Sequence, residues 1–264
     1  GSKSSLAKQL IKKLSNKVIL KTTSRKNFDI LVNFEKLKEI IKSFKPNIII
    51  NCIALTKFLD CEYDPAMAYK INFIFPLKLS IFIRLKRCFL IHFSTEAVFQ
   101  DSLKKLPDEN FKPNPLSIYG NSKYLADKAI SKINNSLIVR LPTLVGPTQN
   151  HQIINKILKK INKNEKVYVS KDIYSTPIKT IDFSDFFLKE IILRNKFIKK
   201  KIIHICSKKR LSTYDIVKMI TKNNKIKANI VPVREDFFKN EFIKPKKLGL
   251  KSIYKECTRE FYYE

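Results

Sequence analysis

Short apolar runs alternate with longer amphipathic segments along this chain. Four runs are typical of buried strands, at 17–20, 48–50, 88–93 and 137–140. Apolar side chains recur at helical spacing between them, at 5–14, 34–44, 64–83 and 122–133. Strand–helix alternation with short connections predicts a parallel, doubly wound sheet, and therefore an α/β fold of the Rossmann-like type. At 264 residues the chain is long enough for a real core and a small additional lobe.

The pattern becomes less regular after Gly146. Helices are expected at 151–162, 181–193 and 212–220, and the last begins with Ser-Thr-Tyr-Asp, a helix N-terminus signal. Strands are expected at 166–170 and 201–205. The segment from Val231 onward is irregular and basic.

Two polar sites in this pattern could together transfer a proton. Thr95 follows the run 88–93, at the end of a predicted strand where open α/β sheets place their chemistry. Tyr119 and Lys123 are four residues apart, so a helix covering both puts them on one side. A lysine ammonium near a phenol favours the phenolate, and we expect it to lower the tyrosine pKa toward neutrality. Thr95 would supply a hydroxyl to the reacting oxygen.

The spacing Tyr-x-x-x-Lys has a plainer interpretation as well. A lysine-rich chain produces it by chance, and the alternative is a surface tyrosine beside a solvated lysine. The hydroxyl pair Ser94-Thr95 at a strand end, followed by the proline-containing loop 107–115, favours the site over that alternative.

The stretches HFSTEAVF (92–99) and PNPLSIYGNSK (113–123) resemble the extended short-chain dehydrogenase/reductases. Among them the chain is most similar to dTDP-4-dehydrorhamnose reductase and related sugar-nucleotide reductases, and 48–56, 140–143 and 175–177 fit in order. The resemblance implies reduction of a 4-keto deoxy-sugar nucleotide by NAD(P)H, in surface polysaccharide or nucleotide-sugar biosynthesis. It implies catalytic roles for Thr95, Tyr119 and Lys123 and substrate contacts for Thr95, Glu96 and Leu144.

The same resemblance implies a division of the chain. Residues 1–146 would form the NAD(P)-binding Rossmann domain. Residues 147–264 would be mixed, with a substrate lobe from about 147–177 and 208–264 and a return to the sheet between them. A homodimer is possible.

The cofactor motif is only partly preserved. The family's turn has the form GxxGxxG, and here Gly1 is kept while Ser4 and Ala7 replace the other two glycines. We expect the first strand to be missing, either because residues before Gly1 are absent or because Gly1-Ser2 is a cloning remnant. A central strand lost in this way would leave its neighbours unpaired.

The resemblance also implies the remaining cofactor contacts. They would come from Gly1, Ser4, Ser5, Leu6, Arg25, Asn33, Phe34, Ala54, Leu55, Thr56, Tyr119 and Lys123. The segment 22–26 carries Arg25 and no acidic residue, and a basic side chain there accommodates a 2′-phosphate. We therefore favour NADP, with NAD possible.

Two departures from the family concern the sugar. Ala97 stands where the reductases usually carry tyrosine, and Leu144 stands where they carry tryptophan. We expect an altered sugar pocket, so another 4-keto sugar nucleotide is as well supported as dehydrorhamnose.

Composition narrows the remaining classes. The five cysteines are scattered without a metal-binding spacing, which favours reduced thiols, a cytoplasmic location and no metal site. His92 and His204 lie in predicted strands, where we expect hydrogen-bonded packing. We expect no spanning helix and no signal peptide. The net charge of +30 is spread along the whole chain, which favours a solvated surface over specific nucleic-acid binding.

Three other functions stay open. One is a non-catalytic, NADP-binding regulatory subunit of the same fold, like the β subunit of methionine adenosyltransferase; the altered glycine turn favours it and the Thr/Tyr/Lys set opposes it. Another is a sugar-nucleotide epimerase or dehydratase, although dehydratases of this group carry Asp-Glu where this chain has Glu96-Ala97. A polyanion-binding protein is supported by charge alone.

Overall fold

A four-stranded parallel sheet forms the centre of the molecule. The computed structural model describes residues 1–24, 29–84, 86–101, 105–146, 153–239, 242 and 245–261. The strands lie in the order β1-β2-β3-β8, and all three pairings are parallel. Their bounds are β1 (Ile48–Asn51), β2 (Phe89–Thr95), β3 (Ser136–Leu141) and β8 (Ile202–His204). The predicted α/β fold is confirmed, and each of these strands lies within two residues of its predicted range.

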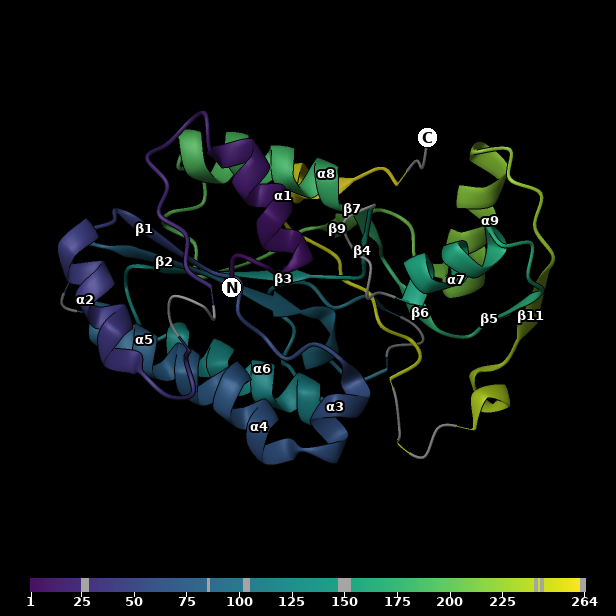
Figure 1. The fold of residues 1–264 in the computed structure, drawn as a ribbon, viewed down its shortest axis with the longest axis horizontal. Coiled ribbons are helices and arrows are strands. Elements are labelled where there is room, and N and C mark those ends of the chain that lie inside the picture. The colour runs from purple at the N-terminus through teal and green to yellow at the C-terminus, as the bar shows by residue number, and fades with distance from the viewer. Residues whose placement is uncertain are drawn as a thin grey trace.

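Helices cover both faces of this sheet (Figure 1). Successive strand residues point to opposite faces. Ile91, Leu137 and Val139 pack in the core cluster that includes the helices of one face. Leu90 and Ile138 pack in the cluster that includes those of the other. The first face carries α1 (Ser5–Leu14), α8 (Thr180–Phe186) and the π-helix η3 (Phe187–Leu193), and the second carries α2 (Phe34–Phe44), α5 (Phe75–Ile83) and α6 (Ile118–Ile130).

Helix α6 begins four residues before the predicted start and ends three residues before the predicted end. Ser117 is its N-cap, and the Ser117 Oγ accepts a hydrogen bond from the backbone N–H of Gly120 at 3.0 Å. The Glu62 carboxylate accepts another from the N–H of Ile118 at 2.9 Å. These two acceptors satisfy first-turn donors that have no partner within a helix. Tyr119 and Lys123 consequently lie in one helix, as their spacing required.

One long helical segment packs against the sheet and α6. It runs through α4 (Pro65–Tyr69), the π-turn η1 (Lys70–Ile74) and α5, and α3 (Phe58–Tyr63) precedes it. Within the part of the chain that the structure describes, 65–83 is the one helix long and apolar enough to cross a membrane. Its side chains Phe75, Leu79 and Ile83 are buried in the core cluster of α2 and α6.

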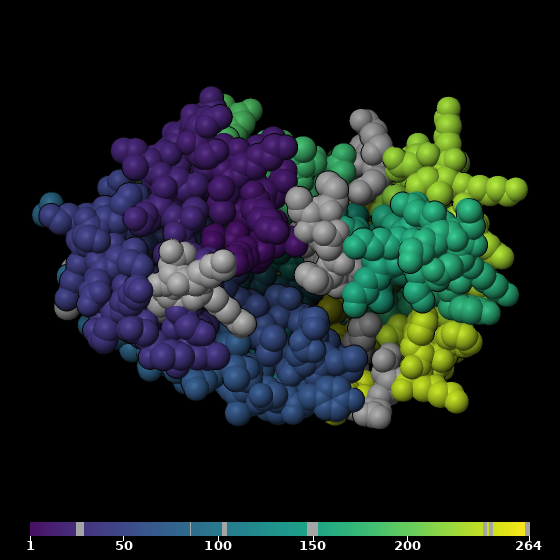
Figure 2. Space-filling model, in the orientation of Figure 1, coloured from purple at the N-terminus to yellow at the C-terminus, as the bar shows by residue number. Residues whose placement is uncertain are grey.

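A separate hydrophobic cluster brings together two helices and two strands from the second half of the chain. It contains side chains of α7 (Ile153–Ile161), β5 (Val167–Ser170), α9 (Thr213–Asn223) and β11 (Ile230–Val233). A capping box joins Ser212 and Asp215 at the start of α9. Figure 2 shows this part of the chain, in green and yellow, on the opposite side of the molecule from the N-terminal residues in purple.

The remaining described elements are short. They are η2 (Glu96–Val98), β4 (Leu144–Val145), β6 (Tyr174–Ser175), β7 (Ile178–Lys179), β9 (Cys206–Ser207), β10 (Leu211–Ser212), η4 (Glu235–Phe238), η5 (Lys255–Cys257) and β12 (Thr258–Arg259).

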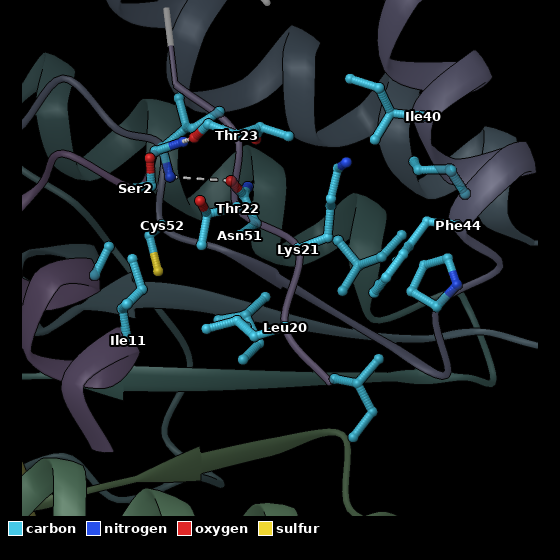
Figure 3. Close-up of a pocket in the computed structure, with 18 of the residues that line it drawn as sticks. Ser2, Ile11, Leu20, Lys21, Thr22, Thr23, Ile40, Phe44, Asn51 and Cys52 are labelled. Atoms are coloured by element: carbon cyan, nitrogen blue, oxygen red, sulfur yellow. Dashed lines mark hydrogen bonds between the residues drawn. The ribbon is translucent and has the colours of Figure 1, made fainter. Parts of the chain in front are cut away.

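A groove runs along the outer edge of β1. It has a volume of about 190 Å³ and is lined by apolar side chains of β1, α1, α2 and α5. Figure 3 shows the segment Leu20–Thr23 along it, with Ile11 of α1 on one side and Ile40 and Phe44 of α2 on the other. The prediction of a strand at 17–20 is wrong, since this segment has no strand conformation. A strand requires a neighbour for its backbone groups, and the groove lies between this segment and β1. That the first strand is missing stays a prediction.

Candidate active site

Thr95 and Tyr119 meet at the carboxyl end of β2, as the sequence predicted. Thr95 is the last residue of β2 and Tyr119 lies in the first turn of α6. The Thr95 side chain hydrogen-bonds the Tyr119 side chain. The Thr95 hydroxyl also accepts a hydrogen bond from the Ala97 N–H at 3.2 Å, which orients it. Both side chains are therefore positioned to act on one reacting oxygen.

Gly120 explains how closely α6 approaches the strand end. A Cβ at this position would lie 2.1 Å from the carbonyl oxygen of Ala97. Any residue other than glycine would push α6 away from η2. The close approach keeps Tyr119, the preceding residue, beside Thr95.

Asn72 joins the loop after β1 to the helix of the catalytic pair. The Asn72 Oδ1 accepts from the Leu55 N–H at 2.8 Å, and its Nδ2 donates to the Leu55 carbonyl at 3.0 Å and to the Ser122 hydroxyl at 3.1 Å. Ser122 in turn donates to the Tyr119 carbonyl at 2.9 Å. The predicted cofactor residues Ala54, Leu55 and Thr56 thus lie in a loop that is tied to α6. Sequence reasoning missed Ser122, whose signal is a small polar residue beside Lys123.

Lys123 is buried, with 2% of its surface exposed, and its Nζ reaches the strand rather than solvent. The Nζ donates to the Phe93 carbonyl at 2.6 Å and lies 3.0 Å from the Nε2 of His92. Burial lowers the pKa of Lys123 to about 8, and the nearest charged group that opposes this is Asp127. His92 is buried and hydrogen-bonded, which confirms the packing role expected for it.

The expected effect of Lys123 on Tyr119 is wrong for the ligand-free protein. Burial raises the pKa of Tyr119 to about 12, and the hydrogen bond from Thr95 offsets only part of the rise. Desolvation disfavours the charged phenolate. The Lys123 amine is directed at His92 and Phe93 of β2, so it does not supply the nearby positive charge that the prediction assumed.

Glu96 lies next to Thr95 and Tyr119 and is also buried. Its Oε1 accepts from the Ser175 hydroxyl at 2.7 Å and from the Thr143 N–H at 3.2 Å, whereas its Oε2 has no hydrogen-bond partner. Burial raises the pKa of Glu96 to about 7. Leu144 is buried in the main core cluster. Substrate contacts by Glu96 and Leu144 stay predictions.

The predicted pyrophosphate residues lie at the start of α1. Ser4 is the N-cap, and its Oγ accepts from the Ala7 N–H at 3.2 Å. Ser5 and Leu6 follow in the first turn, whose backbone N–H groups lack partners within the helix. A Cβ on Gly1 would lie 2.8 Å from the backbone of Cys52, so Gly1 fits closely against the end of β1. A helix N-terminus of this kind suits a phosphate group.

The other cofactor predictions have mixed placements. Asn33 is the N-cap of α2, where its Oδ1 accepts from the Lys36 N–H at 3.0 Å. Phe34 packs edge-on against Phe75 and Phe82. Arg25 lies outside the described residues, so the argument for NADP that depends on it stays a prediction. No cluster of three or more potential metal ligands occurs among the residues described.

A dinucleotide fits this arrangement at both ends. The start of α1 offers free N–H groups near Gly1, and Tyr119 and Lys123 lie at the carboxyl end of the neighbouring strand β2. The anchored loop 54–56 follows β1, which is the neighbour of β2 in the sheet.

The family model of the RmlD substrate binding domain matches residues 1–258. The chain belongs to this family. The match includes the strand end, the Tyr–Lys helix and most of the second half.

Individual relatives support the same placement. The chain is 29% identical over 117 positions to a probable low-salt glycan biosynthesis reductase, Agl14, of Haloferax volcanii. The alignment covers 44% of this chain and 39% of that protein. The chain is 23% identical over 192 positions to methionine adenosyltransferase 2 subunit beta of Xenopus laevis, covering 70% and 57%. The chain thus spans between two fifths and three fifths of these curated relatives.

Solved structures extend the likeness over nearly the whole chain. The dTDP-4-dehydrorhamnose reductase of Bacillus anthracis, solved in complex with NADP, superimposes with a TM-score of 0.85 at 26% identity. The superposition covers 95% of this chain and 88% of that one. RmlD-family proteins therefore share the Rossmann-like fold described above.

Proposed function

We propose that this protein is an NADP-dependent reductase of a 4-keto deoxy-sugar nucleotide, with NAD as an alternative cofactor. The observation that carries the proposal is the meeting of Thr95 with Tyr119 at the carboxyl end of β2, one helical turn from a buried Lys123. The likeness to a reductase that binds NADP supports it.

In this reaction the dinucleotide supplies the hydride. The Tyr119 phenol donates its proton to the oxygen that develops negative charge, and Thr95 donates a hydrogen bond to the same oxygen. A raised pKa of about 12 keeps Tyr119 protonated at working pH, as the acid role in reduction requires. Lys123 would bind the nicotinamide ribose.

The sugar would lie between the strand end and the second half of the chain. Glu96 is held by Thr143 and Ser175, so its carboxyl group is tied to the segments after β3. Ala97 stands where the family usually carries tyrosine, and this difference favours a sugar different from the one that the family's tyrosine contacts. We propose a role in nucleotide-sugar or surface polysaccharide biosynthesis in the cytoplasm.

Titration of NADPH fluorescence tests the proposal, with and without dTDP-, UDP- and GDP-linked 4-keto sugars. We expect NADPH to bind, and one sugar nucleotide to tighten binding and then oxidise the cofactor. Absence of any NADPH or NADH binding would overturn the proposal.

A non-catalytic regulatory subunit is the second candidate. The likeness to methionine adenosyltransferase 2 subunit beta and the side chain at Ser4 favour it. It predicts cofactor binding without oxidation by any sugar nucleotide.

A further inference from the structure

Asn51, His92 and Lys123 form a buried chain of hydrogen bonds that has no role in the reaction proposed above. Asn51 ends β1, His92 lies in the middle of β2, and Lys123 reaches them from α6. The Asn51 Nδ2 lies 3.0 Å from the His92 Nδ1, and the His92 Nε2 lies 3.0 Å from the Lys123 Nζ. Asn51, His92 and Lys123 are 5%, 0% and 2% exposed.

The orientation of the Asn51 amide is fixed by a backbone group. The Asn51 Oδ1 accepts a hydrogen bond from the N–H of Ile53 at 3.0 Å. A backbone N–H can only donate, so the amide oxygen must face Ile53 and the amide NH₂ must face His92. The Nδ1 of His92 is therefore the acceptor of this pair.

The tautomer of His92 follows from that orientation. A neutral imidazole carries one proton, and with Nδ1 accepting, the proton is on Nε2. Burial holds the pKa of His92 well below its usual range, so the doubly protonated form is excluded as well. The Nε2–H of His92 then points at the Nζ of Lys123.

Lys123 must offer a lone pair to this donor. An ammonium has three donors and no acceptor, whereas a neutral amine has two donors and one lone pair. The neutral form satisfies both contacts, because it accepts from His92 and donates to the Phe93 carbonyl. The ammonium form would leave two donors facing each other in a buried place.

The charged groups around Lys123 are consistent with this state. On α6 itself the carboxylate of Asp127 favours an ammonium, but its Oδ2 already accepts from Arg140 of β3 and Ser94 of β2, each at 3.0 Å. Beyond β1, burial raises the pKa of the Cys52 thiol to about 12, which leaves it uncharged.

We propose that Asn51 and His92 are positioning residues that favour the neutral amine of Lys123 over its ammonium in the cofactor-free protein. This inference rests on the proposed function for its consequence: Lys123 takes up one proton from solvent when it leaves His92 to bind the ribose hydroxyls. Above the pKa of about 8 that Lys123 has in the cofactor-free protein, the catalytic ammonium is thus formed by cofactor binding.

Nitrogen NMR of the ligand-free protein tests the tautomer directly. We expect a protonated Nε2 and an unprotonated Nδ1 at His92, with the signal assigned by its loss in His92→Gln. We also expect the Lys123 Nζ to titrate well below the ordinary lysine value of about 10.4. A proton on Nδ1, or a Lys123 that titrates at the ordinary lysine value, overturns the proposal without any variant.

The variant Asn51→Asp replaces the donor that faces the His92 Nδ1 with an acceptor. An acceptor then faces His92, so its proton moves to Nδ1 and its Nε2 can accept from an ammonium. We expect the Lys123 pKa to rise and the His92 tautomer to switch, and an unchanged tautomer contradicts the proposal. Asn47→Asp, an exposed position before β1, is the control for the added charge.

Calorimetry measures whether Lys123 takes up a proton when the cofactor binds. NADPH is titrated in two buffers of different ionisation enthalpy, and we expect uptake of about one proton per NADPH at pH 9 and much less at pH 6.5. Asn51→Asp should abolish the difference. Failure of NADPH to bind would refute the proposed function. Binding of NADPH without proton uptake would refute only the proposed role of Asn51 and His92.

Discussion

The carboxyl end of β2 and the outer edge of β1 belong to neighbouring strands of one sheet, yet the first is closed and the second is open. From His92 to Thr95 every residue of β2 is buried, with β1 on one side, β3 on the other and α6 above. The isoleucines of β1 are only partly buried, and a groove replaces a neighbour at its free edge. The carboxyl end of β2 is thus fixed by contacts within the described chain, whereas a groove lies open along the outer edge of β1.

The largest effect is expected at the closed end. Tyr119→Phe removes the proton donor and should lower turnover about 10²–10⁴-fold, while NADPH binding is retained. Steady-state kinetics with the sugar nucleotide found by titration provide the measurement. Tyr124→Phe, on the same helix, is the matched control and should keep its turnover. Equal rates for the two variants would remove Tyr119 from the mechanism.

The open end should gain stability when its groove is filled. The amino group of Gly1 lies at the groove and donates to the Thr23 carbonyl at 3.3 Å, so an extended segment fused to it can reach the groove. Fusing five alternating valine and isoleucine residues to Gly1 should raise the free energy of unfolding by about 2–4 kcal/mol through new cross-strand pairs.

Urea denaturation measures that gain, and fusion of a Gly/Ser segment of equal length is the control. If both extensions change stability equally, the groove does not bind a strand. If the apolar extension also tightens NADPH binding, the two ends of the site are connected through β1.

Gly120→Ala tests the closeness of packing at the closed end. The new Cβ has no room against the Ala97 carbonyl, so the free energy of unfolding should fall by about 1–3 kcal/mol. Turnover should fall too, because α6 carries Tyr119 away from Thr95. Lys128→Ala, exposed on the same helix, should leave both unchanged. A Gly120 variant with normal stability would show that α6 is free to shift.

The smallest effect concerns the pH dependence of stability at Glu96. Its pKa is raised to about 7, so the folded state binds more protons than the unfolded state between the ordinary carboxyl pKa and that value. Stability therefore falls as pH rises through this window. Glu96→Gln removes the titration, so the free energy of unfolding of the variant relative to wild type should be more favourable at pH 8 than at pH 4.

Thermal or urea unfolding at several pH values measures this difference. Glu165→Gln, at an exposed position, should show none. A parallel pH profile for wild type and Glu96→Gln would mean that Glu96 is ionised in the folded protein.

The sequence was sufficient where local periodicity and burial agree. The strands at 48–51, 89–95 and 136–141 and the helices α1 and α2 were predicted to within two residues. Its prediction was wrong at 17–20, where the apolar pattern of a strand occurs in a segment that has no strand conformation. It was also wrong at the start of α6, where the distant carboxylate of Glu62 accepts a hydrogen bond from the first turn. In both cases the outcome depends on a group far along the chain, which a local pattern does not contain.

By itself, the sequence determined the alternation of strands and helices and the residue types at the site, because both depend on local spacing and on the chemistry of single side chains. Only the tertiary structure decided their charge states. Lys123 was expected to be an ammonium that lowers the pKa of Tyr119. In the folded protein Lys123 is buried against β2, and the amide of Asn51 orients His92 so that the His92 Nε2–H points at the Lys123 Nζ. Protonation depends on desolvation and on the partners that folding brings within 3 Å, and those partners come from three separate segments of the chain.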